Sequence, residues 1–428
     1  MNKKLLALSL VAAPGLMAQE ASESTNAHEQ TGYCNTCCCS PCCCKPCCVP
    51  KPKKCIDCEC YTPAFYDLQC DCGFFFDVEF LYWYAGETDL SYALKAQSTP
   101  RTDQPVIPST LVFAPQNYKS INTKWDPGFR IGIGWNSECD GWDYYLNWTY
   151  YCNKSSNSTS VPDTYNQNGD FGLAAEGQEF LLNPWINQSF HGINPNSDIL
   201  TFDKISAKWR LTFNQVDLEL GRKYWLSRCF NLRPYTGLRG AWTRTNFRTK
   251  SFRDFSDGLT TYDIDFSDKF KSRTWGVGFL GGIQPTWYFC DNFALYSNMD
   301  VALLWGDFEV KKSESYVCVT DQAGTVTIDP NYSNSSTNKF SQMHALLDVA
   351  IGLRWEEYWC CDQYRSNLDL GWEHHIWLNH NHRNKTYDYF ASPGATTLDP
   401  SVDGFRQYDE ATGDLGLGGL VIRLRFDW

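Results

Sequence analysis

The carboxy-terminal stretch TGDLGLGGLVIRLRFDW, residues 412–428, alternates between two kinds of side chain. One set is apolar and the other is mostly charged; the two sets are Leu420, Ile422, Leu424, Phe426 and Trp428, and Val421, Arg423, Arg425 and Asp427. Side chains of a β-strand alternate between its faces with period 2, so one face is apolar and the other carries charge. Such a strand is the repeating unit of a transmembrane β-barrel, and a soluble sheet edge can look the same. The number of recurrences distinguishes the two.

Nine more segments with this alternation precede the last one, and short and long connections alternate strictly between them. The segments lie at about 73–84, 129–136, 142–150, 206–225, 232–246, 275–287, 293–305, 345–355 and 368–378. The short turns lie at 137–140, 227–231, 290–292 and 360–362, and the long connections include 86–123, 153–204, 313–337 and 381–411. Outer-membrane barrels have short periplasmic turns and long extracellular loops.

The sequence therefore predicts an all-β fold, an antiparallel transmembrane β-barrel with at least ten strands. The strand number is even, and it rises to as many as sixteen if the long connections at 86–123 and 153–204 hide further hairpins, for example near 111–113 and 179–185. The final strand should pair with the first, at 74–84, and remove both sheet edges. Within 206–225 the apolar phase slips by one near Asn214 and Gln215, which suggests a β-bulge.

Composition favours a barrel over a helical membrane protein. Mean hydropathy is -0.42, yet 16% of the residues are aromatic and 17 are Trp. A barrel strand shows lipid only every second residue, so low hydropathy with many aromatic residues fits its interfacial girdles; a large secreted β-sandwich is the alternative. Tryptophans near strand ends are the predicted girdle: Trp83, Trp135, Trp209, Trp287, Trp305 and Trp355. A formal net charge of -12 argues against binding to nucleic acid.

The amino-terminal part divides into two predicted segments before the barrel. Residues 1–18 have two lysines, an apolar run and small residues, as in a secretory signal peptide. Residues 19–72 are predicted to be a flexible, cysteine-rich periplasmic segment, because they are rich in polar residues, proline and cysteine and poor in apolar side chains. The barrel is expected to span 73–428.

Cysteine is concentrated in the predicted periplasmic parts. Of 21 cysteines, an odd number, fourteen lie within residues 34–72, and each short turn contains at least one. Several CxxC spacings also suit zinc, but an exported chain meets an oxidising compartment, where disulfides are the default. Either ordinary intrachain bonds stiffen the barrel, or a cross-linking layer joins it to other cysteine-rich envelope proteins and to copies of itself. The candidate residues are Cys139, Cys229, Cys290, Cys360, Cys361, Cys55, Cys58, Cys70 and Cys72.

The face opposite the apolar one carries charges of both signs, which predicts a watery or salt-bridged lumen. The candidate pore-lining residues are Asp77, Glu79, Arg130, Arg210, Asp217, Glu219, Arg239, Asp300, Asp348, Arg354, Asp369, Glu373, Arg423 and Arg425. Rings of charge set the selectivity of open pores. A ten-strand barrel is narrow enough for the same side chains to plug it, whereas open porins usually have about sixteen strands.

No motif points to catalysis or a cofactor, and apart from the CxxC spacings none points to a metal. GxSxG, HExxH and Walker patterns are missing, and the GxGxxG match at residues 276–281 lies inside a strand with no helix after it. The histidines His374, His375, His380 and His382 are interpreted as a wet surface group rather than a metal site. We therefore expect no enzyme activity, no cofactor and no metal.

Two blocks resemble a known family. FFFDVEFLYWY at 74–84 and WDPGFRIGIG at 125–134 are similar to the major outer membrane protein-like porins of chlamydia-like bacteria and the related Legionella outer-membrane family. The resemblance covers about residues 73–428 and implies an outer-membrane porin in an envelope stiffened by disulfides. The dense cysteine block at 34–72 departs from a plain porin.

The predicted function is passive diffusion of small polar solutes across the outer membrane, together with a structural role in a cross-linked envelope. The expected partners are outer-membrane lipid, small polar solutes, cysteine-rich envelope proteins and further copies of the chain. The alternatives are a non-conducting structural barrel and a surface adhesin that acts through its long loops.

Overall fold

The computed structural model describes residues 73–100, 111–137, 142–161, 179–186, 201–227, 229–256, 260–290, 292–328, 332–360, 363–389 and 405–428, all within one compact unit, Lys45–Trp428. The described part contains strands, and no helix long and apolar enough to cross a membrane occurs in it. The strands are β1 (Gly73–Glu87), β2 (Ser91–Pro100), β3 (Leu111–Ser120), β4 (Trp125–Asn136), β5 (Trp142–Ser160), β6 (Glu179–Leu182), β7 (Lys204–Arg222), β8 (Tyr224–Ser227), β9 (Phe230–Ser256), β10 (Thr260–Tyr288), β11 (Phe293–Gln322), β12 (Thr325–Ile328), β13 (Tyr332–Trp359), β14 (Tyr364–Tyr389) and β15 (Phe405–Asp427).

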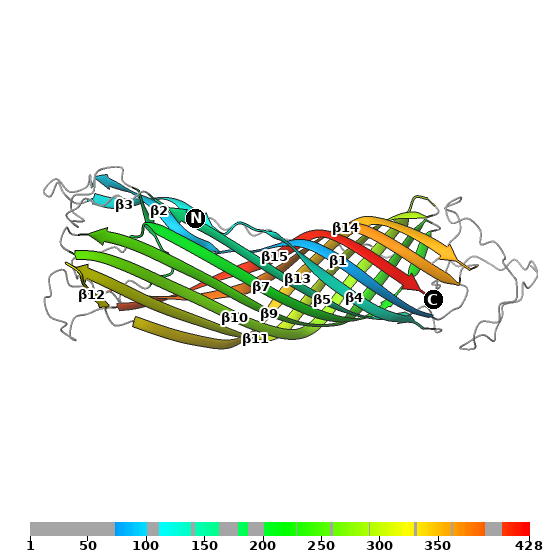
Figure 1. The fold of residues 1–428 in the computed structure, drawn as a ribbon. Coiled ribbons are helices and arrows are strands. Elements are labelled where there is room, and N and C mark those ends of the chain that lie inside the picture. Colours follow the sequence, from blue (N-terminus) through cyan, green and yellow to red (C-terminus); the bar gives the residue numbers. More distant parts are fainter. Residues whose placement is uncertain are drawn as a thin grey trace, which may run out of the picture. The chain divides into compact units, whose positions relative to one another are not determined.

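Ten of these strands form a closed antiparallel ring (Figure 1). The order is β1, β4, β5, β7, β9, β10, β11, β13, β14, β15 and back to β1. The closing pair runs from Phe75 opposite Asp427 to Glu87 opposite Leu415, so the predicted pairing of the last strand with the first is confirmed. Strands β2, β3 and β6 form a separate three-stranded sheet. The regions at 111–113 and 179–185 therefore add no strands to the ring, and its number stays at ten.

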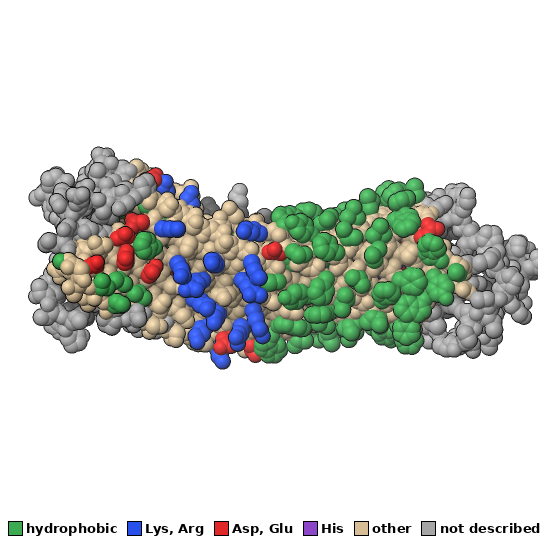
Figure 2. All heavy atoms as spheres, in the orientation of Figure 1, with side chains coloured by type: hydrophobic (Ala, Val, Ile, Leu, Met, Phe, Trp, Pro, Cys, Tyr) green, Lys and Arg blue, Asp and Glu red, His purple; other side chains and the backbone are tan. Residues whose placement is uncertain are grey.

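An apolar belt surrounds the end of the barrel that carries the short turns and the carboxy terminus, here called the turn end (Figure 2). Two rings of exposed tryptophans bound it: Trp135, Trp142, Trp287, Trp355, Trp359 and Trp428 at the turn end, and Trp125, Trp242, Trp275, Trp305 and Trp372 at its other edge. With a rise of about 3.3 Å per residue and a tilt of about 45°, the separation of the rings along β4 and β10 corresponds to a band roughly 23–28 Å tall. That height matches the apolar band of an outer-membrane barrel, about 25 Å.

The strands continue far beyond this belt, toward what is here called the loop end. Strands β9, β10 and β11 contain 27, 29 and 30 residues, whereas about 9–11 residues cross a membrane. The predicted long connection at 313–337 is wrong, since most of it belongs to β11, β12 and β13. It was missed because a strand surrounded by water on its outer side has no apolar outward face to reveal it.

One strand shows how the two halves differ. Every second residue of β7 from Ile205 to Gly221 is buried, and its pairing with β5 and β9 continues without a register shift. The inward face carries Gln215, Asp217 and Glu219 inside the belt, but Trp209, Leu211 and Phe213 beyond it. The predicted bulge is therefore wrong: the apolar set changes sides because the surroundings change from lipid to water.

This exchange of faces corrects three further predictions. Arg210 is exposed on the outside of β7 and does not line the lumen. Trp83 and Trp209 are buried inside the barrel, at 1% and 2% exposure, and do not belong to the aromatic rings. All three lie at or beyond the edge of the belt, where outward positions no longer need to be apolar.

Truncating two neighbouring residues of β7, one inward and one outward, tests the exchange of its apolar and polar faces. We expect Leu211→Ala to lower the free energy of unfolding by about 2–5 kcal/mol, because it leaves a cavity in a packed interior. Thr212→Ala, on the opposite face of the same strand, should change it by no more than about 0.5 kcal/mol. Reversible guanidinium unfolding in lipid vesicles measures both values. If Leu211→Ala costs as little as Thr212→Ala, the interior is not packed at this level.

Candidate functional site

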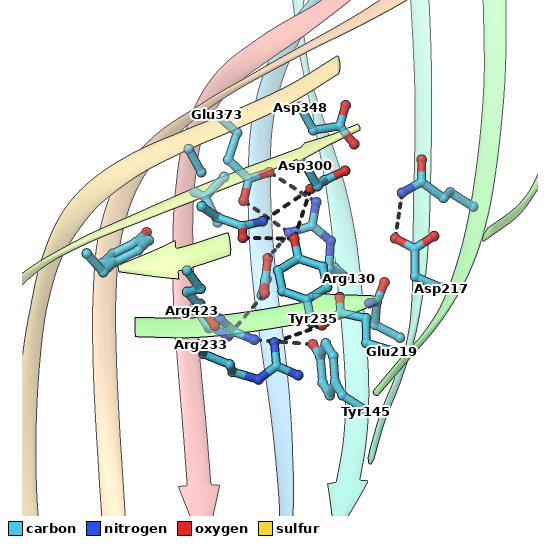
Figure 3. A pocket seen from close by; sticks show the side chains of 18 of the residues that line it. Arg130, Tyr145, Asp217, Glu219, Arg233, Tyr235, Asp300, Asp348, Glu373 and Arg423 are labelled. Atoms are coloured by element: carbon cyan, nitrogen blue, oxygen red, sulfur yellow. Dashed lines mark hydrogen bonds and ion pairs between the residues drawn. The ribbon is translucent and has the colours of Figure 1, made fainter. Parts of the chain in front are cut away.

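The lumen within the belt is lined by charged side chains, here called the charged lumen (Figure 3). All the predicted pore-lining residues except Arg210 lie on inward faces: Asp77, Glu79, Arg130, Asp217, Glu219, Arg239, Asp300, Asp348, Arg354, Asp369, Glu373, Arg423 and Arg425. The inward positions follow from the strand alternation, and the closed ring brings residues from distant parts of the sequence within hydrogen-bonding distance. An isolated buried charge is costly, so each must find a partner of opposite sign.

Arg239 is the centre of one ion-pair cluster. Its guanidinium lies 2.8 Å from Asp217, 3.2 Å from Asp300 and 2.5 Å from Asp348, and its side chain is 3% exposed. The carboxylates come from β7, β11 and β13, so one arginine on β9 connects four strands. The planar guanidinium with its five donors can satisfy several carboxylates at once.

A second cluster lies on the opposite wall, around Arg130 and Arg423. Arg130 is 2.5 Å from Glu79 and 3.0 Å from Glu373. Arg423 is 3.2 Å from Glu79 and 3.4 Å from Asp77. These pairs join β4, β1, β14 and β15, which include the strand pair that closes the barrel.

His375 connects the two clusters. Its Nδ1 is 2.8 Å from Asp348, and its Nε2 is 3.2 Å from Glu373. The two walls of the lumen are therefore bridged by one imidazole between two carboxylates. The prediction that the histidines form a wet surface group is wrong for His375, His380 and His382, which are at most 7% exposed.

Other inward residues of the charged lumen were not among the predicted pore-lining residues. Arg233 pairs with Asp143 at 2.5 Å and with Glu219 at 2.9 Å, and Arg365 pairs with Asp427 at 2.9 Å. Arg233, Arg365 and Asp427 share the inward phase of an identified residue on their own strand, and Asp143 lies opposite the apolar face of its strand. Strand alternation alone could therefore have found them. Tyr145 and Tyr235 were not among the candidate pore-lining residues, because those candidates were chosen for their charge.

A cavity of about 90 Å³ lies among these groups. Its lining includes Arg239. The lining residues Arg130, Tyr145, Tyr235, Asp300 and Glu373 are labelled in Figure 3. The hydroxyl of Tyr145 donates to Asp77 at 2.9 Å, and that of Tyr235 donates to Asn298 at 2.9 Å. A space of this size holds a few water molecules or a small polar solute. The lining offers hydrogen-bond donors and acceptors and charges of both signs.

An apolar layer crosses the interior directly above the charged lumen, toward the loop end. Strands β1, β5, β7, β9, β10, β11, β13, β14 and β15 contribute to it; its residues are Leu81, Trp83, Tyr151, Leu211, Phe213, Ala241, Leu280, Ala302, Leu304, Leu346, Trp377 and Leu417, all at most 3% exposed. The ring of Phe213 lies 5.3 Å from that of Trp377, and Trp83 lies 5.5 Å from Tyr151. Trp83 also contacts His375, at 4.7 Å between ring centroids. The apolar layer therefore rests on the charged clusters below it.

Beyond the apolar layer, toward the loop end, the interior contains both polar and aromatic contacts. Nε2 of His380 lies 2.7 Å from the hydroxyl of Thr243. Closer to the loop end, the guanidinium of Arg383 lies 2.7 Å from Glu87 and 5.4 Å from the ring of Trp185. The outer half of the barrel is thus filled by side chains too. Within the described residues, no group of three or more His, Cys, Asp or Glu is arranged to hold a metal ion.

Three of the predicted cross-linking cysteines lie at the turn end. The backbone carbonyl of Cys229 accepts a hydrogen bond from the amide of Tyr288 at 2.7 Å, and Cys290 and Cys360 are exposed just after β10 and β13. Cys139, Cys361, Cys55, Cys58, Cys70 and Cys72 lie outside the described residues. Three of the candidate cysteines therefore lie at the same end of the barrel, and their periplasmic position and bonding remain predictions.

Comparison with solved structures finds matches of low similarity. The outer membrane protease OmpT from Escherichia coli is 8% identical, over 83% of this chain and 97% of that chain, with a TM-score of 0.28. The P. putida toluene transporter TodX is 8% identical over 83% and 89%, with a TM-score of 0.23. A Pseudomonas aeruginosa FadL homologue is 6% identical over 83% and 90%, with a TM-score of 0.21.

The protease among these structures corrects one expectation. The prediction that the chain catalyses no reaction was drawn from missing motifs, and we withdraw it, because a barrel enzyme is among the similar folds. Similarity at this level assigns no activity to this chain.

The sequence comparisons identify the family. No individual curated protein matches the chain. The family model described as the Legionella pneumophila major outer membrane protein precursor matches residues 70–428, which include every strand of the ring. This chain therefore belongs to the Legionella major outer membrane protein family, whose members are outer-membrane β-barrels.

Proposed function

We propose that this protein is an outer-membrane channel for small polar solutes that the apolar layer holds closed at rest. The observation that carries the proposal is the order of the two interiors: a charged lumen with a cavity lies within the belt, and a packed apolar layer covers it. The sequence favours an open diffusion porin, and the filled interior of a ten-strand barrel supports a closed one.

The charged lumen suits a solute pathway, because hydrogen-bonding groups and charges of both signs lie next to a cavity. The apolar layer suits a gate, since hydrophobic constrictions stop ions and polar solutes by excluding water. Nine strands contribute to this layer, and small movements of Trp83 and Trp377 would change its width most.

A second candidate is a non-conducting structural barrel. The ion pairs of Arg239 and Arg130 favour it, because they tie strands together across the lumen. The adhesin alternative rests on long loops that are largely outside the described residues, so it gains no support from the fold. The likeness to porins of chlamydia-like bacteria also stays a prediction.

Conductance separates the channel from the structural barrel. We expect the full-length protein in planar lipid bilayers to show a closed baseline with brief, small openings. Trp83→Ala with Trp377→Ala should give sustained current, because two large side chains leave the apolar layer. The matched control is Trp125→Ala with Trp372→Ala, which removes two indoles from the outer surface; heat-modifiable mobility on gels checks folding of both variants.

Two outcomes of the conductance measurement would contradict the proposal. Steady current through the natural protein would contradict closure by the apolar layer. Complete silence of the natural protein, together with silence of the folded Trp83 and Trp377 variant, would contradict the channel and leave the structural barrel.

We also propose that the turn cysteines bond to neighbouring envelope proteins. What supports this is the exposure of Cys290 and Cys360 at the turn end, below the aromatic ring that bounds the belt. Such bonds would anchor the barrel on its periplasmic side, where the oxidising compartment maintains them.

Non-reducing gels of intact envelopes test this cross-linking. The natural protein should run as a ladder of high-mass species that a reductant collapses to one band. Cys290→Ser with Cys360→Ser should reduce the ladder, and Cys152→Ser, a half-buried position on β5, should leave it unchanged. A single monomeric band from unreduced envelopes would overturn the proposal.

A further inference from the structure

Lysine and arginine side chains form a basic patch on the outside of the barrel, just beyond the apolar belt (Figure 2). They lie on five neighbouring strands, β5, β7, β9, β10 and β11, at outward positions of each. The residues are Lys154, Lys208, Arg210, Arg244, Arg248, Lys250, Lys269, Lys271, Arg273 and Lys311, and all are exposed except the half-buried Lys269.

Strand register places like charges directly opposite one another in this patch. Arg244 is opposite Arg273, and the next row joins Lys271 to Lys311. Further pairs are Lys154 with Arg210, Lys208 with Arg248, and Arg248 with Lys269. Like charges at directly opposed positions destabilise a sheet, so the fold alone gives no reason for this arrangement.

The patch lacks internal neutralisation. No ion pair joins any of its ten members to a carboxylate of the described residues. Glu309 is directly opposite Arg273 in the sheet, but its carboxylate pairs with Lys339, outside the patch, at 3.8 Å. The pKa of Lys269 is lowered from its ordinary value, chiefly by the charge of Lys271, then by partial burial and by the charge of Arg248. A cation loses its proton more easily in this way where positive charge accumulates without an anion.

The position of the patch defines what can reach it. Trp242 and Trp275 are opposite each other in the aromatic ring, and the opposed pair Arg244 and Arg273 lies two residues closer to the loop end on the same outward faces. Two successive residues of a strand span about 6.6 Å along it. The first row of the patch is therefore at the depth where lipid headgroups begin. The later rows extend from there toward the loop end.

We propose that the basic patch binds the phosphate groups of outer-leaflet lipid headgroups. Phosphate matches the forked donors of the four arginines and the point charges of the six lysines. The patch continues directly from the lipid-facing belt, so one lipid can contact both with its acyl chains and its headgroup. Bound phosphates would also screen the five like-charge pairs.

Native mass spectrometry of the full-length protein in neutral detergent tests the proposal, with bisphosphorylated lipid A as the probe. We expect Arg244→Gln with Lys271→Gln and Arg273→Gln to weaken its apparent affinity by at least about tenfold, given the contribution of each cation near a charged headgroup. The matched control is Lys119→Gln with Lys124→Gln and Lys339→Gln, which removes three positive charges from outside the patch. It should bind the probe as the natural protein does.

The unfolding temperature, measured without lipid, checks that the triple variant in the patch is folded. The triple variant in the patch should unfold at a temperature equal to or above that of the natural protein, because like-charge repulsion is removed. Competition separates the sources of phosphate: inorganic phosphate at the same concentration should not displace the lipid.

Two results would overturn the proposal. One is equal loss of lipid binding in both triple variants, which would mean general charge attraction. The other is displacement of lipid A by inorganic phosphate or binding of soluble heparin at equal affinity, which would assign the patch to a soluble polyanion.

Discussion

Each long strand of this barrel passes from lipid into water, and this passage decides which of its faces must be apolar. Inside the belt the outward face meets acyl chains, so polar groups point inward. Beyond the belt water surrounds the barrel, so the apolar side chains turn inward as they do in a soluble protein. Strand β7 makes the change without a register shift, between Phe213 and Gln215 on its inward face.

The two interiors follow from this constraint. Charges confined to the lumen of the belt have no bulk water, so they pair across it, as Arg239 does with three aspartates. Breaking one such pair would leave buried charges unpaired, at a cost of about 3–5 kcal/mol. The loop half instead builds a core of indole, phenyl and aliphatic side chains. The apolar layer is where the two interiors meet, and it separates the charged lumen from the outer half.

Alternation predicted much of the fold because it needs only the residues of one strand. The ten-strand ring, the closing pair of β15 with β1, the turn end and nearly all lumen charges follow from period 2. Arg210, Trp83 and Trp209 were misplaced because alternation shows two faces and does not say which faces lipid. The strand part of residues 313–337 was missed for a related reason, since its outward face is polar. The ion-pair partners could not be predicted, because Arg130 and Glu373 meet only when the ring closes.

The height of the lipid boundary is the central claim, and NMR of the deuterated full-length protein in lipid nanodiscs measures it directly. Cross-peaks between backbone amides and acyl-chain protons should cover β9 up to Trp242, β10 down to Trp275 and β11 up to Trp305. Amides from Arg244 to Lys250 should show none. Acyl-chain contacts that continue along β9 to Lys250 would place the whole strand in lipid and contradict the change of surroundings on which this account depends.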